Sequence, residues 1–583
     1  MNTKIRIRCE NTNLSKEYLR GITLKEIAED QKIKLQDDIL GATVNNRVRE
    51  LDYELYNPKT VRFFDIHAVE GYRMYMRSLI FVLGKAVKDC YPQLTLRVEH
   101  SLPIGFYCEL DGLDKLGDKA QEETDSNGHR ALPLSLVQTL KQRMQAIIRA
   151  NLPFTREEIP SEEAVTLYRE RHYPAKAMLF ETRQQAYSSV YYLDGEPNYF
   201  YGALVPSTGY LKTFDIDRYF QGLVIVWPDH IEKLAQNRQR VVQNYIREQS
   251  EGGTKLFRIF QEHKDWLEIL GVPYVGYLNK EVQEQGPGRL IKISEALQEK
   301  KIAHIADEIA KRPDCRLVLI SGPSSSGKTT FCKRLSVQLQ VLGYRTAEIS
   351  MDDYFVDRDH TPRDKNGEYD FECIEAVDVP FFTQQLNELL ALQTEQTVEM
   401  PVFDFISGSR KWGMKQIRMS PQTILIVEGI HGLNPQLSAG IDPKYIFKIF
   451  VSALTHIAID TQNPIRSTDN RLIRRIVRDH NFRGNSALNT LRRWNSVIQG
   501  ENKNIFPYQE NADIMFNSAL LFELCVLKAH AEPLLRDVPE ACPEYATARS
   551  LLKFLSFFCY ISEKEIPPTS ILREFLGGSS FVY

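Results

Sequence analysis

A chain of 583 residues is long enough for three or four domains, each with its own hydrophobic core. Its net charge of -3 and its pI near 6.5 exclude a general electrostatic attraction to nucleic acid or to a membrane surface. The nine cysteines include no CxxC pair, and no uncharged apolar stretch reaches about 18 residues, so we expect no disulfide framework, no membrane span and a cytoplasmic protein.

The first 67 residues alternate short elements and predict a small α+β unit. Residues 4–9 alternate polar and apolar side chains as a strand does, and residues 24–31 have the apolar spacing of a helix. Short strands separated by Asn-containing turns are expected over 42–47, 49–51 and 61–65. A long helix predicted over 69–90 then leads into a second mixed region, which we place at 68–228.

The second half begins with a charged, helix-rich stretch over 229–312, which we interpret as a connector. Over 313–520, apolar β-branched runs alternate with helical segments, and this pattern predicts an α/β fold with a parallel sheet covered by helices on both faces. The predicted strands are 317–320, 346–350, 423–427 and 446–451. Residues 521–583 are predicted to form a C-terminal helical extension.

The run Gly322-Pro-Ser-Ser-Ser-Gly327-Lys328-Thr329 follows the first of these strands and matches the phosphate-binding loop GxxxxGK[ST]. Glycine lets backbone N–H groups close around an anionic phosphate, and the helix that follows directs its positive end at the same group. We expect Lys328 to neutralise the β- and γ-phosphates and the Thr329 hydroxyl to hold Mg²⁺. The residues expected to contact a nucleoside triphosphate are Gly322, Ser324, Ser325, Ser326, Gly327, Lys328, Thr329 and Thr330.

Two further strands are predicted to bring carboxylates to the same edge of the sheet. The strand 423–427 runs into Glu428, which we expect to bind Mg²⁺ directly or through water. The strand 346–350 is followed by Asp352 and Asp353, either of which could accept the proton of an attacking hydroxyl group and help to hold the metal ion. A role in a turn or a helix cap is the alternative for these aspartates.

A run of arginines without lysine marks the segment 471–478. Arg471, Arg474, Arg475 and Arg478 share one face of a predicted helix. Guanidinium groups suit bidentate contacts with phosphate, so this face is predicted to close as a lid, with Arg474 and Arg478 in catalytic roles and Arg471 at the substrate. A solvated basic face is the alternative.

Together these segments resemble the uridine kinase and phosphoribulokinase branch of P-loop kinases over residues 315–520. Ser350-Met-Asp352-Asp353-Tyr-Phe355 is similar to the family's acidic segment, and the resemblance implies that Asp352 deprotonates a substrate 5′-hydroxyl and contributes to the metal site. Tyr369-Asp-Phe-Glu372 is similar to a segment whose last carboxylate holds the ribose hydroxyls, here Glu372.

The segment 401–410 is similar to the part of this family that surrounds the base. The family has a tyrosine and a histidine there, whereas this chain has Phe403 and Gly408. The resemblance therefore implies a substrate contact at Phe403 but does not define the preferred base.

The front of the chain resembles different proteins. Residues 1–67 resemble a TGS domain, which has a β-grasp fold, and residues 68–228 resemble the second additional domain of threonyl-tRNA synthetases. In synthetases that domain edits mischarged tRNA through an HxxxH pair and a later Cys and His. The aligned positions here are Arg77, Phe81, Phe200 and Leu204, so we expect neither hydrolytic editing nor a zinc site.

The leading hypothesis is an ATP- and Mg²⁺-dependent nucleoside kinase that acts on a small-molecule nucleoside. One alternative is a kinase of the same fold that phosphorylates another hydroxyl compound. The other is a nucleotide-gated, RNA-associated regulator, although no basic-aromatic stripe supports RNA binding by the N-terminal half. The sequence does not fix the oligomeric state, and a homo-oligomer is compatible with it.

Overall fold

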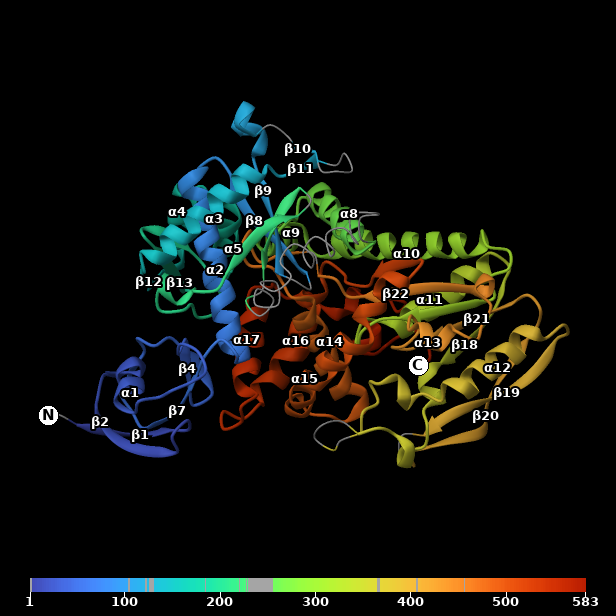
Figure 1. The fold of residues 1–583 in the computed structure, drawn as a ribbon. Coiled ribbons are helices and arrows are strands. Elements are labelled where there is room, and N and C mark those ends of the chain that lie inside the picture. The colour runs from blue at the N-terminus through green and yellow to red at the C-terminus, as the bar shows by residue number, and fades with distance from the viewer. Residues whose placement is uncertain are drawn as a thin grey trace.

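The computed structural model describes most of the chain. The described part excludes residues 1–2, 103–104, 121–122, 125–129, 184, 220, 227, 229–254, 364–366, 368, 405–406 and 456. Figure 1 shows a small N-terminal unit at one end and an α/β unit with the C-terminus at the other, with a second mixed unit and three helices between them.

The N-terminal unit is a five-stranded sheet on which α1 (Leu24–Asp30) packs. Its strands, in spatial order, are β2 (Leu14–Leu19), β1 (Lys4–Cys9), β7 (Lys59–Phe64), β4 (Gly41–Val44) and β5 (Arg47–Arg49). Strands β1 and β7 run parallel, and the other neighbouring pairs are antiparallel, which is the arrangement of a β-grasp fold. The strand predicted over 49–51 lies earlier in the chain, because Asn45 and Asn46 adopt positive φ and turn the chain directly into β5.

The second unit surrounds the long helix α2 (Val69–Cys90), whose bounds match the predicted helix. It contains an antiparallel sheet in the order β15 (Asp215–Tyr219), β16 (Gly222–Val226), β9 (Gly105–Asp111) and β8 (Thr95–Leu102). A second sheet joins β12 (Phe154–Pro160), β13 (Tyr187–Leu193) and β14 (Glu196–Asn198). Further helices are α3 (Leu134–Arg149), α4 (Ser161–Glu170) and α5 (Pro174–Thr182).

In the described residues 255–310, three helices connect this unit to the α/β unit. They are α8 (Lys255–Leu270), α9 (Val275–Gln285) and α10 (Gly288–Ala310). Helix α9 packs on α5 of the second unit, and α10 packs on the helix that follows the phosphate-binding loop. The described part of the predicted connector is therefore packed against both of its neighbours.

The α/β unit is built on a five-stranded parallel sheet. Its order is β18 (Arg345–Ser350), β21 (Thr423–Glu428), β17 (Leu317–Ser321), β22 (Ile446–Ser452) and β23 (Ile514–Asn517). Alternate side chains of β17 enter two separate cores: Val318 and Ile320 face one, and Leu317 and Leu319 face the other. The surrounding helices are α11 (Lys328–Val341), α12 (Val379–Ala391), α14 (Ser467–Arg483) and α15 (Ala487–Asn504). This topology confirms the predicted sheet.

A two-stranded ribbon, β19 (Gln396–Asp404) with β20 (Ser409–Met419), extends from one side of the α/β unit (Figure 1). It contacts the turn that follows β18.

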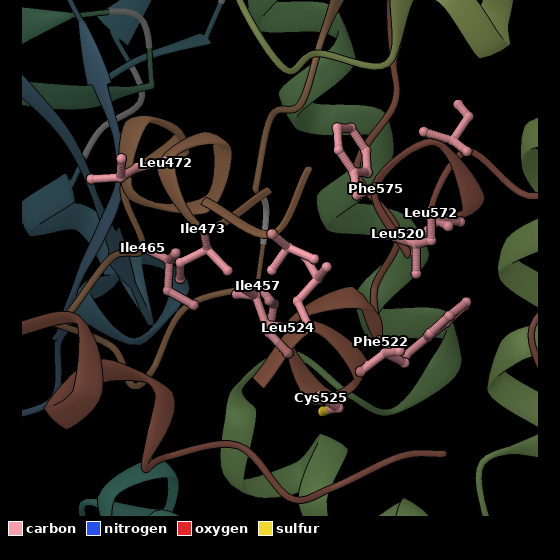
Figure 2. Packing of buried hydrophobic residues seen from close by; sticks show 14 of the residues in the cluster. Ile457, Ile465, Leu472, Ile473, Leu520, Phe522, Leu524, Cys525, Leu572 and Phe575 are labelled. Atoms are coloured by element: carbon pink, nitrogen blue, oxygen red, sulfur yellow. The ribbon is translucent and has the colours of Figure 1, made fainter. Parts of the chain in front are cut away.

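The C-terminal extension is part of the core of the α/β unit. It contains α16 (Glu523–Arg536), α17 (Tyr545–Leu555) and the short α18 (Arg573–Leu576). Figure 2 shows Leu572 and Phe575 beside Leu520 in the cluster that also holds Leu472 of α14, and both are fully buried. The short helix α18 is thereby held next to the phosphate-binding loop.

Within the described residues, no helix combines the length and the apolar character that crossing a bilayer requires.

Candidate functional site

The phosphate-binding loop leaves β17 at the carboxyl edge of the sheet and enters α11. A Cβ atom on Gly322 would collide with the carbonyl oxygen of Val451, so only glycine fits there. Gly327 has φ +80 at the N-cap of α11, a left-handed conformation that glycine adopts without strain. The Lys328 ammonium donates to the Pro323 carbonyl at 3.2 Å and so lies over the loop that it is predicted to serve.

The sheet register brings the predicted metal ligands to this loop. Glu428 ends β21 and pairs with Ile320 of β17 on one side and with Ser350 of β18 on the other. The Thr329 hydroxyl lies 3.5 Å from a Glu428 carboxylate oxygen. Asp352 follows β18 by two residues and is exposed. Among the described residues, no three His, Cys, Asp or Glu side chains are grouped so as to hold a metal ion by themselves.

The carboxylates around Lys328 have raised pKa values. Burial raises the pKa of Glu428 to about 7, and Asp352 adds to this effect while Lys328 opposes it. Although part of the Asp352 side chain reaches solvent, the surrounding protein atoms desolvate the carboxyl group and raise its pKa, again against the attraction of Lys328. These interactions place Asp352 and Glu428 in one electrostatic cluster with Lys328. Carboxyl groups whose pKa values are raised toward neutrality are typical of proton-transfer sites.

The two adjacent aspartates have different surroundings. Asp353 accepts a hydrogen bond from the Phe403 N–H at 3.4 Å and pairs with Lys415 at 3.3 Å, so it fastens the β19–β20 ribbon to the turn after β18. Asp352 instead interacts with Lys328. Of the two aspartates, Asp352 is thus the one that interacts with the phosphate-binding lysine, and it is also the one that the sequence spacing favours as the predicted proton acceptor.

Glu372 lies on the other side of this cluster. Its side chain packs on Gly500 of α15, and burial raises its pKa to about 7, with a further increase from Glu501. Arg475 and Lys328 act on it in the opposite direction. Glu372 is thus close enough to interact with the phosphate-binding lysine, as a residue that holds a substrate near the loop requires.

The predicted substrate contact Phe403 is a core residue of the ribbon. It is 5% exposed and packs edge-on against Phe355 at 5.7 Å between ring centroids. Gly408 has φ +70 and lies against the Arg358 side chain, which fills the space that a larger residue would need. Arg358, which lies outside the segment 401–410, therefore occupies the place beside Gly408 where the resemblance implies a polar base contact, while residues 405–406 lie outside the described part.

The predicted lid of four arginines requires a correction. Arg471 and Arg474 are 1% and 0% exposed and do not present free guanidinium groups to the site. Arg471 pairs with Glu501 at 2.7 Å and donates to the Ser324 carbonyl, while Arg474 pairs with Glu523 and donates to the Ser325 carbonyl. The α14 face that was predicted as a lid therefore packs against the backbone of the phosphate-binding loop. The buried ion pairs hold these two arginines in place under the loop.

The other two arginines of that face remain nearer to the reacting groups. Arg475 donates to the Ser324 hydroxyl at 2.8 Å and acts on Glu372, and Arg478 is paired with Asp479 at 3.2 Å. Asp479 is buried and also pairs with Arg475, so it orients both guanidinium groups. Arg475 and Arg478 are thus only half-buried, in contrast to Arg471 and Arg474.

Glu574 is a functional-site residue that no local pattern indicated. Its carboxylate accepts hydrogen bonds from the Thr330 hydroxyl at 2.7 Å and from the Thr330 backbone N–H at 3.2 Å. The Tyr583 hydroxyl contacts the same threonine at 2.9 Å, and Ile571 lies against Gly327. The C-terminal segment therefore places a negative charge on a backbone N–H in the first turn of α11, where phosphate is expected to bind.

Comparison with known proteins finds similarity to different groups in the two halves of the chain. Residues 317–521 match the Phosphoribulokinase / Uridine kinase family. The N-terminal half is 27% identical over 202 residues to the threonine–tRNA ligase of Syntrophomonas wolfei and 30% identical over 203 residues to that of Thermotoga maritima. Each alignment covers 34% of this chain and 29% of the ligase, so the chain spans less than a third of the length of these relatives.

Solved kinase structures also align with this chain at low identity. A protein named as a possible uridine kinase from Bacillus stearothermophilus is 19% identical, with a TM-score of 0.23 over 35% of this chain and 89% of its own. The D-glycerate 3-kinase of Cryptococcus neoformans var. grubii is 12% identical, with a TM-score of 0.20 over 46% of this chain and 89% of its own. The fold assignment accordingly depends on the sheet topology and on the family match.

Proposed function

We propose that this chain, whose residues 317–521 form a P-loop kinase unit, is an ATP-dependent kinase that transfers the γ-phosphoryl group to the 5′-hydroxyl of a ribonucleoside. The observation that carries the proposal is the meeting of Lys328, Glu428 and Asp352 at the carboxyl ends of three adjacent parallel strands. Ligands of open α/β sheets bind at this edge.

The residues present fit a nucleotide-bound Mg²⁺ ion. Mg²⁺ prefers oxygen ligands and in kinases is usually held by one or two carboxylates together with substrate phosphates. The Thr329 hydroxyl and the Glu428 carboxylate supply such oxygens, and Asp352 is close enough to Glu428 to raise its pKa. When bound, the ion would neutralise charge on the phosphate oxygens.

The chain itself supplies a base and positive charge for in-line transfer. Asp352 accepts the proton of the acceptor hydroxyl, whose oxygen bonds to the γ-phosphorus as the bond between that phosphorus and the leaving ADP oxygen breaks. Lys328 and the backbone N–H groups of the loop hold the phosphates in line, and Arg475 and Arg478 add guanidinium charge. The raised pKa of Asp352 makes it a better proton acceptor than an ordinary aspartate.

For the phosphoryl acceptor, the structure favours a specific second candidate. Phe403 is buried, and Arg358 from outside the base segment covers Gly408, so an arginine replaces the polar pair that the family resemblance implies. Glu372 still provides a carboxylate for vicinal hydroxyl groups. A sugar or another small polyol with two neighbouring hydroxyls is therefore the second candidate acceptor.

A turnover panel tests the proposal directly. The full chain would be incubated with ATP, Mg²⁺ and each ribonucleoside or polyol in turn, and products would be identified by mass spectrometry. We expect one class of acceptor to gain a single phosphate, with a nucleoside 5′-monophosphate as the product. Release of inorganic phosphate with no phosphorylated acceptor in any reaction would contradict the proposal and favour a nucleotide-gated regulator.

A further inference from the structure

A cavity lies between the front half of the chain and the α/β unit, and no residue of the phosphate-binding loop lines it. It has a volume of about 40 Å³ and is lined by Arg73 and Arg77 of α2, Arg466 at the N-cap of α14, and Ser550 of α17. In Figure 1 one end of α2 lies near α17. At about 10–15 Å³ for each water-sized group, the cavity accommodates a group of roughly three such units.

The charges that face this cavity are not balanced. Arg73 lies 3.8 Å from Asp469, the one carboxylate that lines it among the described residues, and the Arg73 Nε atom is buried with no hydrogen-bond partner there. Arg77 donates to the Ala203 carbonyl at 2.9 Å. The Arg466 guanidinium group makes no hydrogen bond or close ion pair with the described residues and is attracted only at longer range by Asp469. Three guanidinium groups thus share a single negative partner.

The excess of positive charge also lowers the pKa values of the cationic groups. Burial, with contributions from Arg466 and Arg73, lowers the pKa of Arg77 to about 10. Burial and Arg73 likewise lower the pKa of Arg466. One helical turn beyond Ser550, Lys553 has a pKa lowered to about 7 by burial and by neighbouring arginines that include Arg77. Partly buried cations without partners are costly, and a bound anion would remove that cost.

The packing at Arg77 indicates that the cationic site is built into the fold. A Cβ atom on Gly202 would overlap the Arg77 guanidinium group, so glycine at this position lets the chain pass directly over the arginine. The other positions aligned with the synthetase editing residues hold no polar chemistry, because Phe81, Phe200 and Leu204 are buried in one apolar core. Of the four aligned positions, Arg77 is thus the one with a polar side chain, and it shares the cavity with Arg73 and Arg466.

We propose that this cavity binds the phosphate group of a phosphorylated small molecule. Guanidinium groups recognise phosphate oxygens through paired hydrogen bonds, and the α14 N-terminus, which has no side-chain cap, adds a favourable dipole. The cavity has room for about one phosphate group, so the rest of the ligand would extend from its mouth. Tyr201 and Met76 line that cavity and offer apolar surface.

The site is placed to connect the two halves of the chain. The loop that precedes Arg466 is anchored to the front half by a fully buried Lys176–Asp460 pair at 2.8 Å and by hydrogen bonds from Asn198 to Gln462 and from Asn463 to the Tyr199 carbonyl. The same helix that begins at the cavity carries Arg471 and Arg474 to the phosphate-binding loop. A ligand that bridges α2 and α14 would therefore stabilise the junction.

The test is a calorimetric titration of inorganic phosphate into the full chain at constant ionic strength, after the phosphate-binding loop has been saturated with a non-hydrolysable ATP analogue and Mg²⁺. We expect one phosphate to bind to the wild type. Because a hydrogen bond to a charged group contributes more than about 1.5 kcal/mol, Arg466→Gln and Arg73→Gln, which each remove a guanidinium group that lines the cavity, should each weaken binding by about tenfold or more. Arg493→Gln, which removes an exposed arginine of α15, is the matched control and should bind as the wild type does.

Thermal denaturation provides an independent readout in case one variant binds poorly because it is misfolded. Without phosphate, Arg466→Gln should melt at a higher temperature than the wild type, since it removes a repelled charge. Added phosphate should raise the melting temperature of the wild type by more than that of the variant. A nucleoside 5′-monophosphate titrated in parallel identifies the source: tighter binding than phosphate indicates a phosphorylated metabolite, and equal binding indicates the free ion.

Two results would overturn the proposal: no phosphate binding to the loaded wild type, or equal binding by the wild type, both pocket variants and the control. Failure of the ATP analogue to bind would count against the proposed kinase function instead. In that event, phosphate binding that depends on Arg466 but not on Arg493 would still support this cavity.

Discussion

At the scale of single residues, the crowding of carboxylates around Lys328 has a consequence for stability. Glu428 has a pKa raised from 4.5 to about 7, so its protonated form is favoured in the folded chain without nucleotide. The stabilising contribution of such a group is fully present below its unfolded pKa and is lost as the pH rises through about 7. Binding of a cation would reverse this preference, because it requires the ionised form.

The variant Glu428→Gln should therefore gain stability relative to the wild type as the pH increases. We expect the difference in melting temperature between the variant and the wild type to be larger at about pH 8 than at about pH 5, measured without nucleotide or Mg²⁺. The exposed Glu565→Gln provides the control and should show no such trend. A difference that does not change with pH would contradict the raised pKa.

At the scale of elements, Glu574 of α18 and a bound nucleotide phosphate would compete for the same N–H group at the start of α11. Glu574 accepts from both the N–H and the hydroxyl group of Thr330, and its charge also helps to raise the pKa of Glu428. A nucleotide phosphate at that N–H would have to displace the carboxylate. Truncation of the C-terminal segment is a poor test of this competition, since Leu572 and Phe575 are fully buried and their removal would damage the core.

The substitution Glu574→Gln keeps the shape of the side chain and removes its charge. We expect the Kd for Mg²⁺-free ATP to fall by about tenfold, in line with about 1.4 kcal/mol for one charged hydrogen bond, as measured by calorimetry. The exposed Glu565→Gln again serves as the comparison, with unchanged affinity expected. An unchanged or weaker affinity in Glu574→Gln would mean that the carboxylate does not compete with phosphate.

Helix α14 carries a second prediction at this scale. Because the Arg474–Glu523 pair is fully buried, removing one partner leaves an uncompensated charge in the core. Arg474→Leu should lower the free energy of unfolding by about 3–5 kcal/mol, whereas the double variant Arg474→Leu/Glu523→Leu should recover much of that loss. Denaturant titration measures both. A single variant with wild-type stability and no turnover would instead restore the predicted catalytic role of Arg474.

At the scale of the whole molecule, the regular elements were predictable where side-chain periodicity is local. The strand Lys4–Cys9 and the helix Val69–Cys90 match their predicted bounds, and the strands around Leu317 and Glu428 follow from buried apolar runs. The phosphate-binding loop follows from its glycines and lysine in the same way. These features depend on residues that are close in sequence.

The carboxylates that pair with the arginines of α14 and with Thr330 could not be predicted from local sequence patterns. Glu501 lies 30 residues from Arg471, and Glu523 lies 49 residues from Arg474. Glu574 lies 244 residues from Thr330. The arginine face of α14 was therefore interpreted without the buried carboxylates that neutralise it, and the acidic C-terminal turn gave no sign of the loop on which it lies.

The most direct test of the account is the amount of phosphorylated acceptor formed for each ADP, compared among the wild type, Asp352→Asn and Asp353→Asn with the acceptor that the turnover panel identifies. We predict one phosphorylated acceptor for each ADP in the wild type. Asp352→Asn should react about 10²-fold more slowly or worse while still binding ATP, and Asp353→Asn should retain most of the rate. Wild-type turnover in Asp352→Asn, or ADP formed without a phosphorylated acceptor, would contradict the proposed transfer.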